Sequence, residues 1–182
     1  RIDNRIEAVQ KVLNEKYNNQ ERISVYVKQL DTDRVAAIND EKSMYAASVA
    51  KLGVLYYAQE RLSQKKLSLS DEYQYTSAVN GFPGAYDPDG SGKISKMPDD
   101  KNYSLENLLK AVAQNSDNVA TNILGYYVAN QYDKAFQKSV DKAAATSWNM
   151  DKKELTARAA GTLMEAVYRQ NGDIINYLSS TD

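Results

Sequence analysis

The 182-residue sequence is long enough for one domain, and its 42% hydrophobic and 26% charged residues are typical of a globular protein. The net charge of −1 and the scattered lysines and arginines give no reason to expect nucleic acid as a partner. Because the chain has no cysteine and no histidine, disulfides, thiolate nucleophiles, serine–histidine triads and histidine-ligated metals are all excluded.

The first 62 residues predict a helix, a hairpin and a second helix. Helical spacing of apolar residues predicts a helix over residues 3–18, with Asp3 or Asn4 as its cap. Alternation predicts a strand over residues 22–30, followed by a turn and a short strand over residues 35–38. These strands should form a hairpin, which is marginal alone, and the sequence supplies no obvious strands to extend it. A buried helix is expected from Tyr45 to about Leu62.

A long irregular loop and a run of helices complete the chain. Glycine, proline, aspartate and serine gather between residues 69 and 100, and loops of this length often lie at a functional rim. Helices are expected over about 104–114, after 116–117, and over about 131–143, 155–168 and 173–179. The order of elements predicts an α+β fold with segregated helices and strands.

Ser48 and Lys51 form a Ser-x-x-Lys pattern inside the expected second helix. Residues three apart share a helix face, so the serine hydroxyl and the lysine amine should lie close together. Apolar neighbours would remove water from the lysine and lower its pKa, which suits it to take the serine proton. The alternative is a chance pattern with the lysine extending to water.

A second motif, Ser116-Asp117-Asn118, follows at an expected helix start. Taken alone it is explained as a helix cap, because serine, aspartate and asparagine are the favoured capping residues. Together with the first motif, in this order and on a hairpin-then-helices layout, it becomes much more specific.

The two motifs resemble those of the class A β-lactamase and penicillin-binding superfamily, and the resemblance spans essentially the whole chain. It implies a β-lactamase/transpeptidase-like fold and a single domain over residues 1–182. Residues 1–45 would supply the helix and hairpin of an α/β lobe, and residues 46–182 a mainly helical lobe.

The resemblance also implies roles for the motif residues. Ser48 would attack the carbonyl of a β-lactam or a D-Ala-D-Ala peptide, with Lys51 as base or proton relay. Ser116 would relay a proton to the leaving nitrogen, and Asn118 would orient the substrate's acyl side chain and the lysine. Asn122 matches a further asparagine of the class A group. The oxyanion hole would use the Ser48 N–H and one from a later strand.

The sequence departs from the family pattern at its C-terminal end. The third motif, Lys-Thr-Gly, is absent, and the chain stops at Asp182 before the family's last strands and helix. We therefore expect a fragment that lacks the C-terminal strands of the sheet and is inactive by itself. The hairpin should then present an unpaired edge and exposed apolar side chains.

A second departure concerns deacylation, which class A enzymes assign to a glutamate on the omega loop. Between Val140 and Leu155 the only glutamate is Glu154, where the next helix is expected to begin. A first-turn acid there is explained by the helix dipole. We therefore carry no deacylating role onto Glu154, and we expect slow release of any acyl group.

The segment from Asp87 to Ile94 fits the first eight positions of an EF-hand calcium loop. Pro98 stands where a bidentate glutamate is expected, which favours a turn-rich loop beside the mouth of the site over a calcium site. Tyr86 and Tyr103 flank this loop, either as packing residues or as the lining of a substrate groove.

The sequence thus predicts an extracytoplasmic bacterial serine hydrolase, secreted or membrane-anchored, that acts on β-lactams or peptidoglycan-type D-Ala peptides. One alternative is a penicillin-binding D,D-carboxypeptidase or transpeptidase-like protein with slow deacylation. The other is a non-catalytic cell-wall-binding module that keeps the fold. We expect no cofactor, no metal, no nucleic acid and, because no run of 18 apolar residues occurs, no membrane span in this chain.

Overall fold

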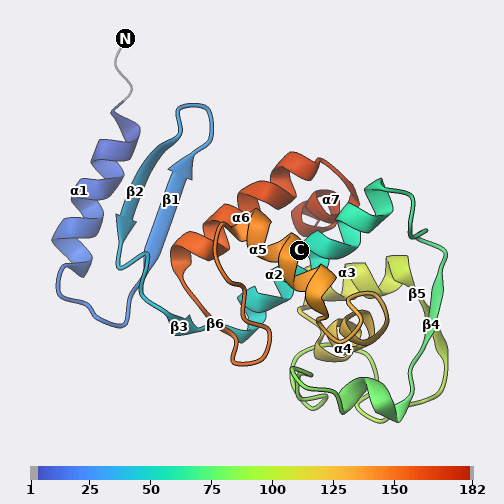
Figure 1. Ribbon diagram of the computed structural model, residues 1–182. Coiled ribbons are helices and arrows are strands. Elements are labelled where there is room, and N and C mark those ends of the chain that lie inside the picture. The colour runs from blue at the N-terminus through green and yellow to red at the C-terminus, as the bar shows by residue number, and fades with distance from the viewer. Residues whose placement is uncertain (1–3, 181–182) are drawn as a thin grey trace.

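The computed structural model describes residues 4–180 and divides them between a helix-and-hairpin unit and a larger helical lobe (Figure 1). In chain order, the elements are α1 (Arg5–Tyr17), β1 (Val25–Gln29), β2 (Arg34–Ile38), β3 (Met44–Tyr45), α2 (Ala47–Ser63), β4 (Glu72–Gln74), the 3-10 helix η1 (Ser77–Asn80), β5 (Asn102–Ser104), α3 (Leu105–Asn115), α4 (Asn118–Tyr127), α5 (Lys134–Ala144), β6 (Glu154–Leu155), α6 (Ala157–Gln170) and α7 (Asp173–Ser179). This confirms the predicted α+β class, with one hairpin followed by a run of helices. None of the described helices is both long and apolar enough to cross a membrane.

The N-terminal unit consists of α1 packed on the β1–β2 hairpin. The strands are antiparallel, with Val25 opposite Ile38 at one end and Gln29 opposite Arg34 at the other, which confirms the predicted hairpin. The small core of this unit holds three buried side chains, Ile6, Leu13 and Ala36. Asn4 precedes α1 without a side-chain cap bond, and Asp3, the other expected cap, lies outside the described residues.

The hairpin has an unpaired edge, as the sequence predicted, because among the described residues no third strand joins β1 and β2. Beside β1, an apolar groove of about 600 Å³ is lined mainly by β1, β3, α2 and α6. The side chains of Tyr45, Val49 and Met164 line this groove and are 73%, 40% and 37% exposed. These three side chains belong to β3, α2 and α6, whereas the apolar side chains of β1 and β2 are partly or fully buried. The predicted exposure of the hairpin's own apolar side chains is therefore met in the turn, at Leu30, and is wrong for the two strands.

The helical lobe is built around α2, which lies between the other helices in Figure 1 and carries a continuous buried face. The side chains of Ser104, Asp117 and Thr156 each accept a hydrogen bond from a backbone N–H in the first turn of α3, α4 and α6. These capped helices close over a single large apolar cluster that includes Val54, Leu109 and the indole of Trp148.

Two short antiparallel β-ladders, β3–β6 and β4–β5, were not predicted from the sequence. Met44 and Tyr45 pair with Leu155 and Glu154, so α2 begins at Ala47 and not at Tyr45. The expectation that Glu154 starts a helix is wrong, because it lies exposed in β6 and α6 starts at Ala157. The loop expected over residues 69–100 contains β4, which pairs with β5, and η1. Ladders of two or three residues are too short to show alternation in the sequence.

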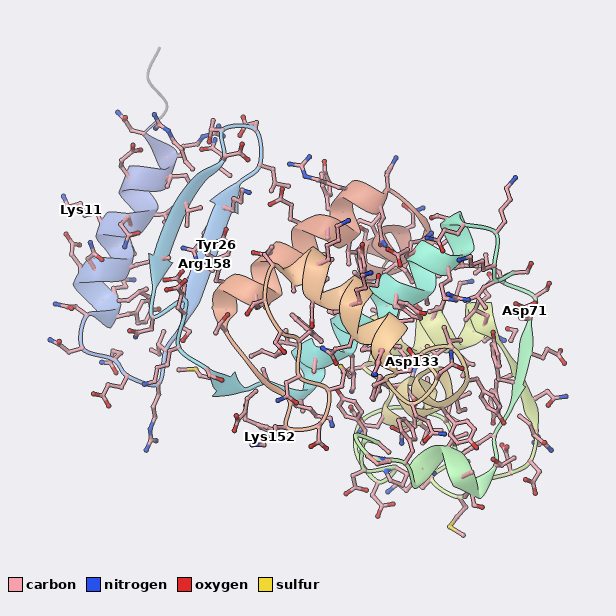
Figure 2. All side chains as sticks on the ribbon, viewed as in Figure 1. Lys11, Tyr26, Asp71, Asp133, Lys152 and Arg158 are labelled. Carbon is pink, nitrogen blue, oxygen red and sulfur yellow. The ribbon has the colours of Figure 1, made fainter. Side chains whose placement is uncertain are left out.

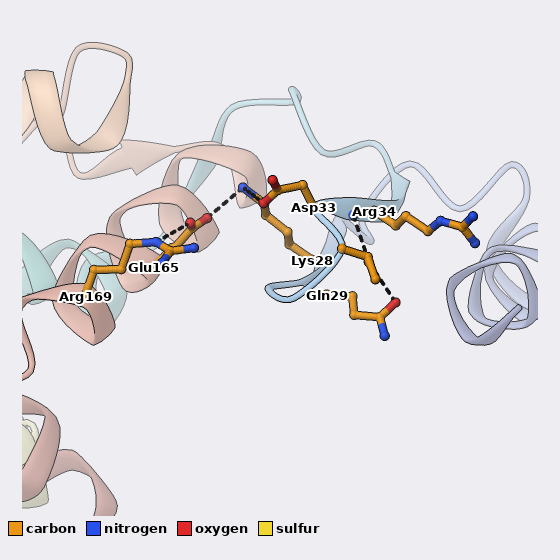
Figure 3. Close-up of polar contacts among 7 residues, drawn as sticks. Lys28, Gln29, Asp33, Arg34, Glu165 and Arg169 are labelled. Atoms are coloured by element: carbon orange, nitrogen blue, oxygen red, sulfur yellow. Dashed lines mark hydrogen bonds and ion pairs between the residues drawn. The ribbon is translucent and has the colours of Figure 1, made fainter. Parts of the chain in front are cut away.

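The two units meet where β1 lies against α6. Tyr26 covers Gly161 so closely that a Cβ added to the glycine would lie 2.4 Å from the tyrosine ring. The Arg158 guanidinium lies over the same ring at 5.0 Å and donates to Asp40 Oδ2 at 2.7 Å (Figure 2). At the far end of β1, Lys28 Nζ donates to Glu165 Oε1 at 2.8 Å (Figure 3). This junction therefore relies largely on polar groups.

Candidate active site

The first turn of α2 brings Ser48 and Lys51 to one cavity of about 300 Å³. Ser48 is the second residue of α2 and is exposed, whereas Lys51, one turn later, is 3% exposed. The cavity is lined by Tyr45, Ala47, Ser48, Lys51, Ala85, Tyr86, Asp87, Ser91, Asn118, Asp151 and Lys153. An accessible hydroxyl thus shares a small, open-mouthed cavity with a buried amine.

Three oxygen atoms of the second motif accept hydrogen bonds from Lys51. Its Nζ donates to Ser116 O at 2.6 Å, to Ser116 Oγ at 2.9 Å and to Asn118 Oδ1 at 2.6 Å. An ammonium has three protons, so all of its donors are used by these acceptors. Within the described part of the chain, Lys51 Nζ does not donate a hydrogen bond to the hydroxyl of Ser48.

The pKa of Lys51 is lowered to about 8, chiefly because burial disfavours the charged form. The nearby carboxylate of Asp117 acts in the opposite direction. The Ser116 carbonyl also favours the cation, since it belongs to the carboxyl end of α3, where the helix dipole is negative. A lysine with a pKa near 8 supplies both protonation states close to neutral pH, which suits a proton-transfer group.

Ser116 and Asp117 form a corner between two helices. Ser116 ends α3 in the left-handed conformation, with φ of 51°, and Asp117 caps the start of α4. The Asp117 side chain is 1% exposed; its Oδ1 accepts from Ala120 N at 2.9 Å and its Oδ2 from Lys93 N at 2.8 Å. The capping explanation of this motif is therefore correct for Asp117, while Ser116 and Asn118 face Lys51.

The irregular loop lies directly against this corner. Asn118 N donates to Ser91 O at 2.8 Å, and Asn118 Nδ2 donates to Asp87 O at 2.9 Å. Gly92 has a φ of 123°, and a Cβ there would lie 2.3 Å from the Asp117 carboxyl carbon. Ser91 Oγ donates to Ser116 O at 2.7 Å, an acceptor that it shares with Lys51. The glycine-rich loop is thus fitted to the second motif.

The structure offers no support for calcium in this loop. The carboxylate of Asp87 accepts from Asp89 N at 2.9 Å within its own turn. Among the described residues there is no group of three or more acidic side chains placed to hold a metal ion. Of the two tyrosines flanking the loop, Tyr86 lines the cavity, whereas Tyr103 packs on Tyr75 and donates to Asp99.

A second buried lysine, Lys153, enters the cavity from the segment before β6. Its Nζ donates to Gly84 O at 2.9 Å and to Met150 O at 2.8 Å, and its side chain is largely buried. Burial lowers its pKa, against the opposing effect of Asp151. Lys153 therefore fastens this short segment to the loop around Gly84.

The structure brings together all four residues predicted for the site, Ser48, Lys51, Ser116 and Asn118. Their catalytic roles stay predictions. The sequence reasoning missed Ser91, Asp151 and Lys153, which line the same cavity. Asp151 and Lys153 match no pattern, and Ser91 belonged only to the EF-hand-like match; all three lie in irregular backbone. Asp87 and Asp151 are the lining residues with a carboxylate; Glu154 is not among them.

A protein-family model described as the beta-lactamase enzyme family matches residues 4–182. Among curated proteins, no match reaches significance. The solved structures, by contrast, contain many similar folds.

Three of these structures illustrate the similarity. PBP-A has a TM-score of 0.70 at 14% identity, over 89% of this chain and 62% of its own. A beta-lactamase from Sphaerobacter thermophilus has a TM-score of 0.67 at 16% identity, over 99% and 67%. The D-alanyl-D-alanine carboxypeptidase DacD from Francisella tularensis has a TM-score of 0.67 at 16% identity, over 85% and 38%. At these identities the similarity establishes the fold, and this chain spans about three-fifths of the length of PBP-A.

Proposed function

The chain belongs to the beta-lactamase enzyme family, and from this premise we propose that it is a serine hydrolase that forms an ester on Ser48. Its substrates are β-lactams or the D-alanyl peptides of peptidoglycan. The observation that carries the proposal is the buried Lys51, hydrogen-bonded to Ser116 and Asn118 in the cavity that Ser48 lines. In a chain without histidine, a lysine of lowered pKa is the natural base for a serine.

The acylation step uses the neutral amine of Lys51. A neutral amine donates only two hydrogen bonds, so its lone pair is free to accept the proton of Ser48 Oγ. The oxygen then bonds to the substrate carbonyl carbon, the carbon–nitrogen bond breaks, and the proton passes through Ser116 Oγ to the leaving nitrogen. The N–H of Ser48, in the first turn of α2, is one donor for the developing oxyanion.

Release of the acyl group is the slow step of the proposed reaction. The class A group assigns this step to a glutamate, and Glu154, the one glutamate between Val140 and Leu155, is not among the residues that line the cavity. Loss of a general base typically costs about 10²–10⁴-fold in rate. The solved structures include a mutant of PBP-A as an acyl-enzyme complex with penicillin G, a precedent for this kind of intermediate on this fold.

An extracytoplasmic location and a small-molecule or peptide partner are parts of the same proposal. Cell-wall peptides and β-lactams are encountered outside the cytoplasm, and the similar structures include a D-alanyl-D-alanine carboxypeptidase and several penicillin-binding proteins. The proposed chemistry needs only side chains and backbone groups, so it calls on no cofactor.

The experiment is mass spectrometry of the full-length protein after incubation with a fluorescent penicillin. We expect a persistent adduct on Ser48, which Ser48→Ala removes and the control Ser43→Ala, at an exposed serine outside the cavity, retains. Because Lys51 must be neutral to act, adduct formation should rise about tenfold per pH unit below pH 8 and level off above it.

Two other results would contradict parts of this proposal. Rapid turnover without an accumulating adduct would contradict slow release and would direct attention to Asp151, whose Asp151→Asn variant should then accumulate the ester. Binding of cell-wall peptides without any adduct would favour the non-catalytic module. That alternative has one observation in its favour: all three protons of a charged Lys51 are held by residues other than Ser48.

A further inference from the structure

Tyr86 lies between the nucleophile turn and the two buried lysines, and its backbone is tightly held. Asn122 Oδ1 accepts from Tyr86 N at 2.7 Å, and Asn122 Nδ2 donates to Tyr86 O at 2.8 Å. The same Nδ2 donates to Asn80 Oδ1 at 2.9 Å. Asn122 is fully buried in α4, so this residue of the irregular loop is fixed to the helical core.

The hydroxyl of Tyr86 reaches the start of α2. It donates to Ala47 O at 2.7 Å, and Ala47 immediately precedes Ser48. Burial raises the pKa of Tyr86 well above its ordinary value, so the hydroxyl keeps its proton and stays a donor throughout the working pH range. The position of the Ser48 turn is therefore coupled to that of the tyrosine.

The ring of Tyr86 makes a cation–π contact with each of the two buried lysines. Lys51 Nζ lies 4.9 Å and Lys153 Nζ 4.5 Å from the ring centroid. An aromatic face at this distance attracts a cation, and the attraction strengthens where water is excluded. It favours the protonated form of Lys51 and so opposes the effect of burial.

We propose that Tyr86 is a positioning residue of this site: its hydroxyl fixes the turn that carries Ser48, and its ring sets the protonation of Lys51. The first part rests on the proposed function of Ser48. The second concerns Lys51 alone and is measurable without any substrate.

Four other charged side chains surround Lys51, and one of them, Lys153, lies over the same ring. They are Asp117 at the start of α4, Asp87 in the loop, and Asp151 and Lys153 before β6. Water admitted by loss of the ring would raise the Lys51 pKa, since burial is what lowers it, so a lowered Lys51 pKa in Tyr86→Leu reports the ring.

Two variants separate the hydroxyl from the ring. Tyr86→Phe keeps the ring and loses the bond to Ala47, whereas Tyr86→Leu loses both. Tyr127→Phe and Tyr127→Leu are the matched controls, because the Tyr127 hydroxyl also donates to a backbone carbonyl, Gln74 O at 2.8 Å, outside the cavity. Circular dichroism and a thermal midpoint for each variant report whether it is folded.

The pKa of Lys51 is measured by NMR of ¹³C-labelled lysine side chains, with the resonance assigned by its loss in Lys51→Arg. We expect Tyr86→Leu to lower this pKa by about 0.5–1 unit and Tyr86→Phe to leave it within about 0.2 unit of the parent value. The pH midpoint of acylation should move with it, to lower pH, in Tyr86→Leu only. Tyr86→Phe should lower the maximal acylation rate about 2–10-fold at an unchanged midpoint.

An unchanged Lys51 pKa in a folded Tyr86→Leu protein would overturn the role of the ring. An acylation rate in Tyr86→Phe equal to that of Tyr127→Phe would overturn the role of the hydroxyl. Failure of the parent protein to form a Ser48 adduct is a different result. It would refute the proposed function, and with it the role of the hydroxyl, while the NMR titration would still decide the role of the ring.

Discussion

The helix-and-hairpin unit and the helical lobe differ in how each is held together. In the lobe, a large cluster of buried side chains surrounds α2, and α3, α4, α5 and α6 each begin at a residue whose side chain caps the helix. In the unit of α1, β1 and β2, the core holds three buried side chains, and the junction with α6 adds one aromatic contact and two groups of ion pairs. The lobe contains the candidate site, while the hairpin only borders the groove beside it.

This difference teaches that the candidate site lies in the part of the chain that has the larger core. The residues of the site come from α2, from the α3–α4 corner and from two irregular segments, all of which are packed on the lobe. Loosening the hairpin should therefore change the groove before it changes the cavity. The following substitutions test that separation.

The largest effect is expected from a matched pair of core truncations. Leu109→Ala, at a fully buried position in α3, should lower the free energy of unfolding by about 2–5 kcal/mol, because it leaves a cavity in the large cluster. Leu13→Ala, in α1, should cost no more than about 2 kcal/mol, because the core around it holds only two other buried side chains. Urea unfolding followed by circular dichroism measures both.

Amide hydrogen exchange shows which region of the molecule loses stability in each variant. We expect faster exchange throughout the lobe in Leu109→Ala, but only in α1, β1 and β2 in Leu13→Ala. Equal loss of protection in the lobe for both variants would show that the two regions unfold as one unit.

A smaller effect is expected at the junction. Gly161→Ala places a Cβ against the ring of Tyr26, which should push β1 away from α6 at a cost of about 1–3 kcal/mol. Gly81→Ala is the control, because the nearest atom to its added Cβ lies at 3.8 Å. Exchange in β1 and β2 should increase in Gly161→Ala alone, with the Lys51 titration unchanged. A shifted Lys51 pKa would mean that the hairpin and the site are coupled.

The smallest effect is expected from Glu165→Gln. Hydrogen bonds from Lys28 and then Arg169 lower the pKa of Glu165, so its carboxylate stabilises the junction above the ordinary pKa of about 4.5. That contribution disappears as the pH falls through the lowered value. The parent and the variant should therefore differ in hairpin exchange at pH 7 and converge in acid. Added salt should reduce the difference at pH 7, since these groups are near the surface.

The elements with a strong local signal could be predicted from the sequence. The cap of α4, the β1–β2 hairpin and the span of α7 all follow from residue types and spacing within a few positions. The ladders β3–β6 and β4–β5 could not be predicted in this way, because their pairing joins segments about 110 and 30 residues apart and each strand is too short for a pattern.

The candidate site shows the same division. Ser48, Lys51, Ser116 and Asn118 carry spacing and order, which local reasoning detects. Lys153 and Ser91 join the site only because irregular backbone returns to it, and Lys153 even has a left-handed φ of 56°. The bonds made by Lys51 also lay outside sequence reasoning, since they depend on how the α3–α4 corner packs against α2.

Trp148 gives the lobe a built-in optical reporter. It is the single tryptophan of the chain and is fully buried, and its Nε1 donates to Ala50 O at 3.1 Å, in the same turn of α2 as Ser48 and Lys51. Excitation near 295 nm therefore selects one fluorophore directly behind the candidate nucleophile, without any label. Its emission should follow events in this turn and remain insensitive to the hairpin, which allows the rate of acylation and the loosening of the N-terminal unit to be followed separately in the unmodified protein.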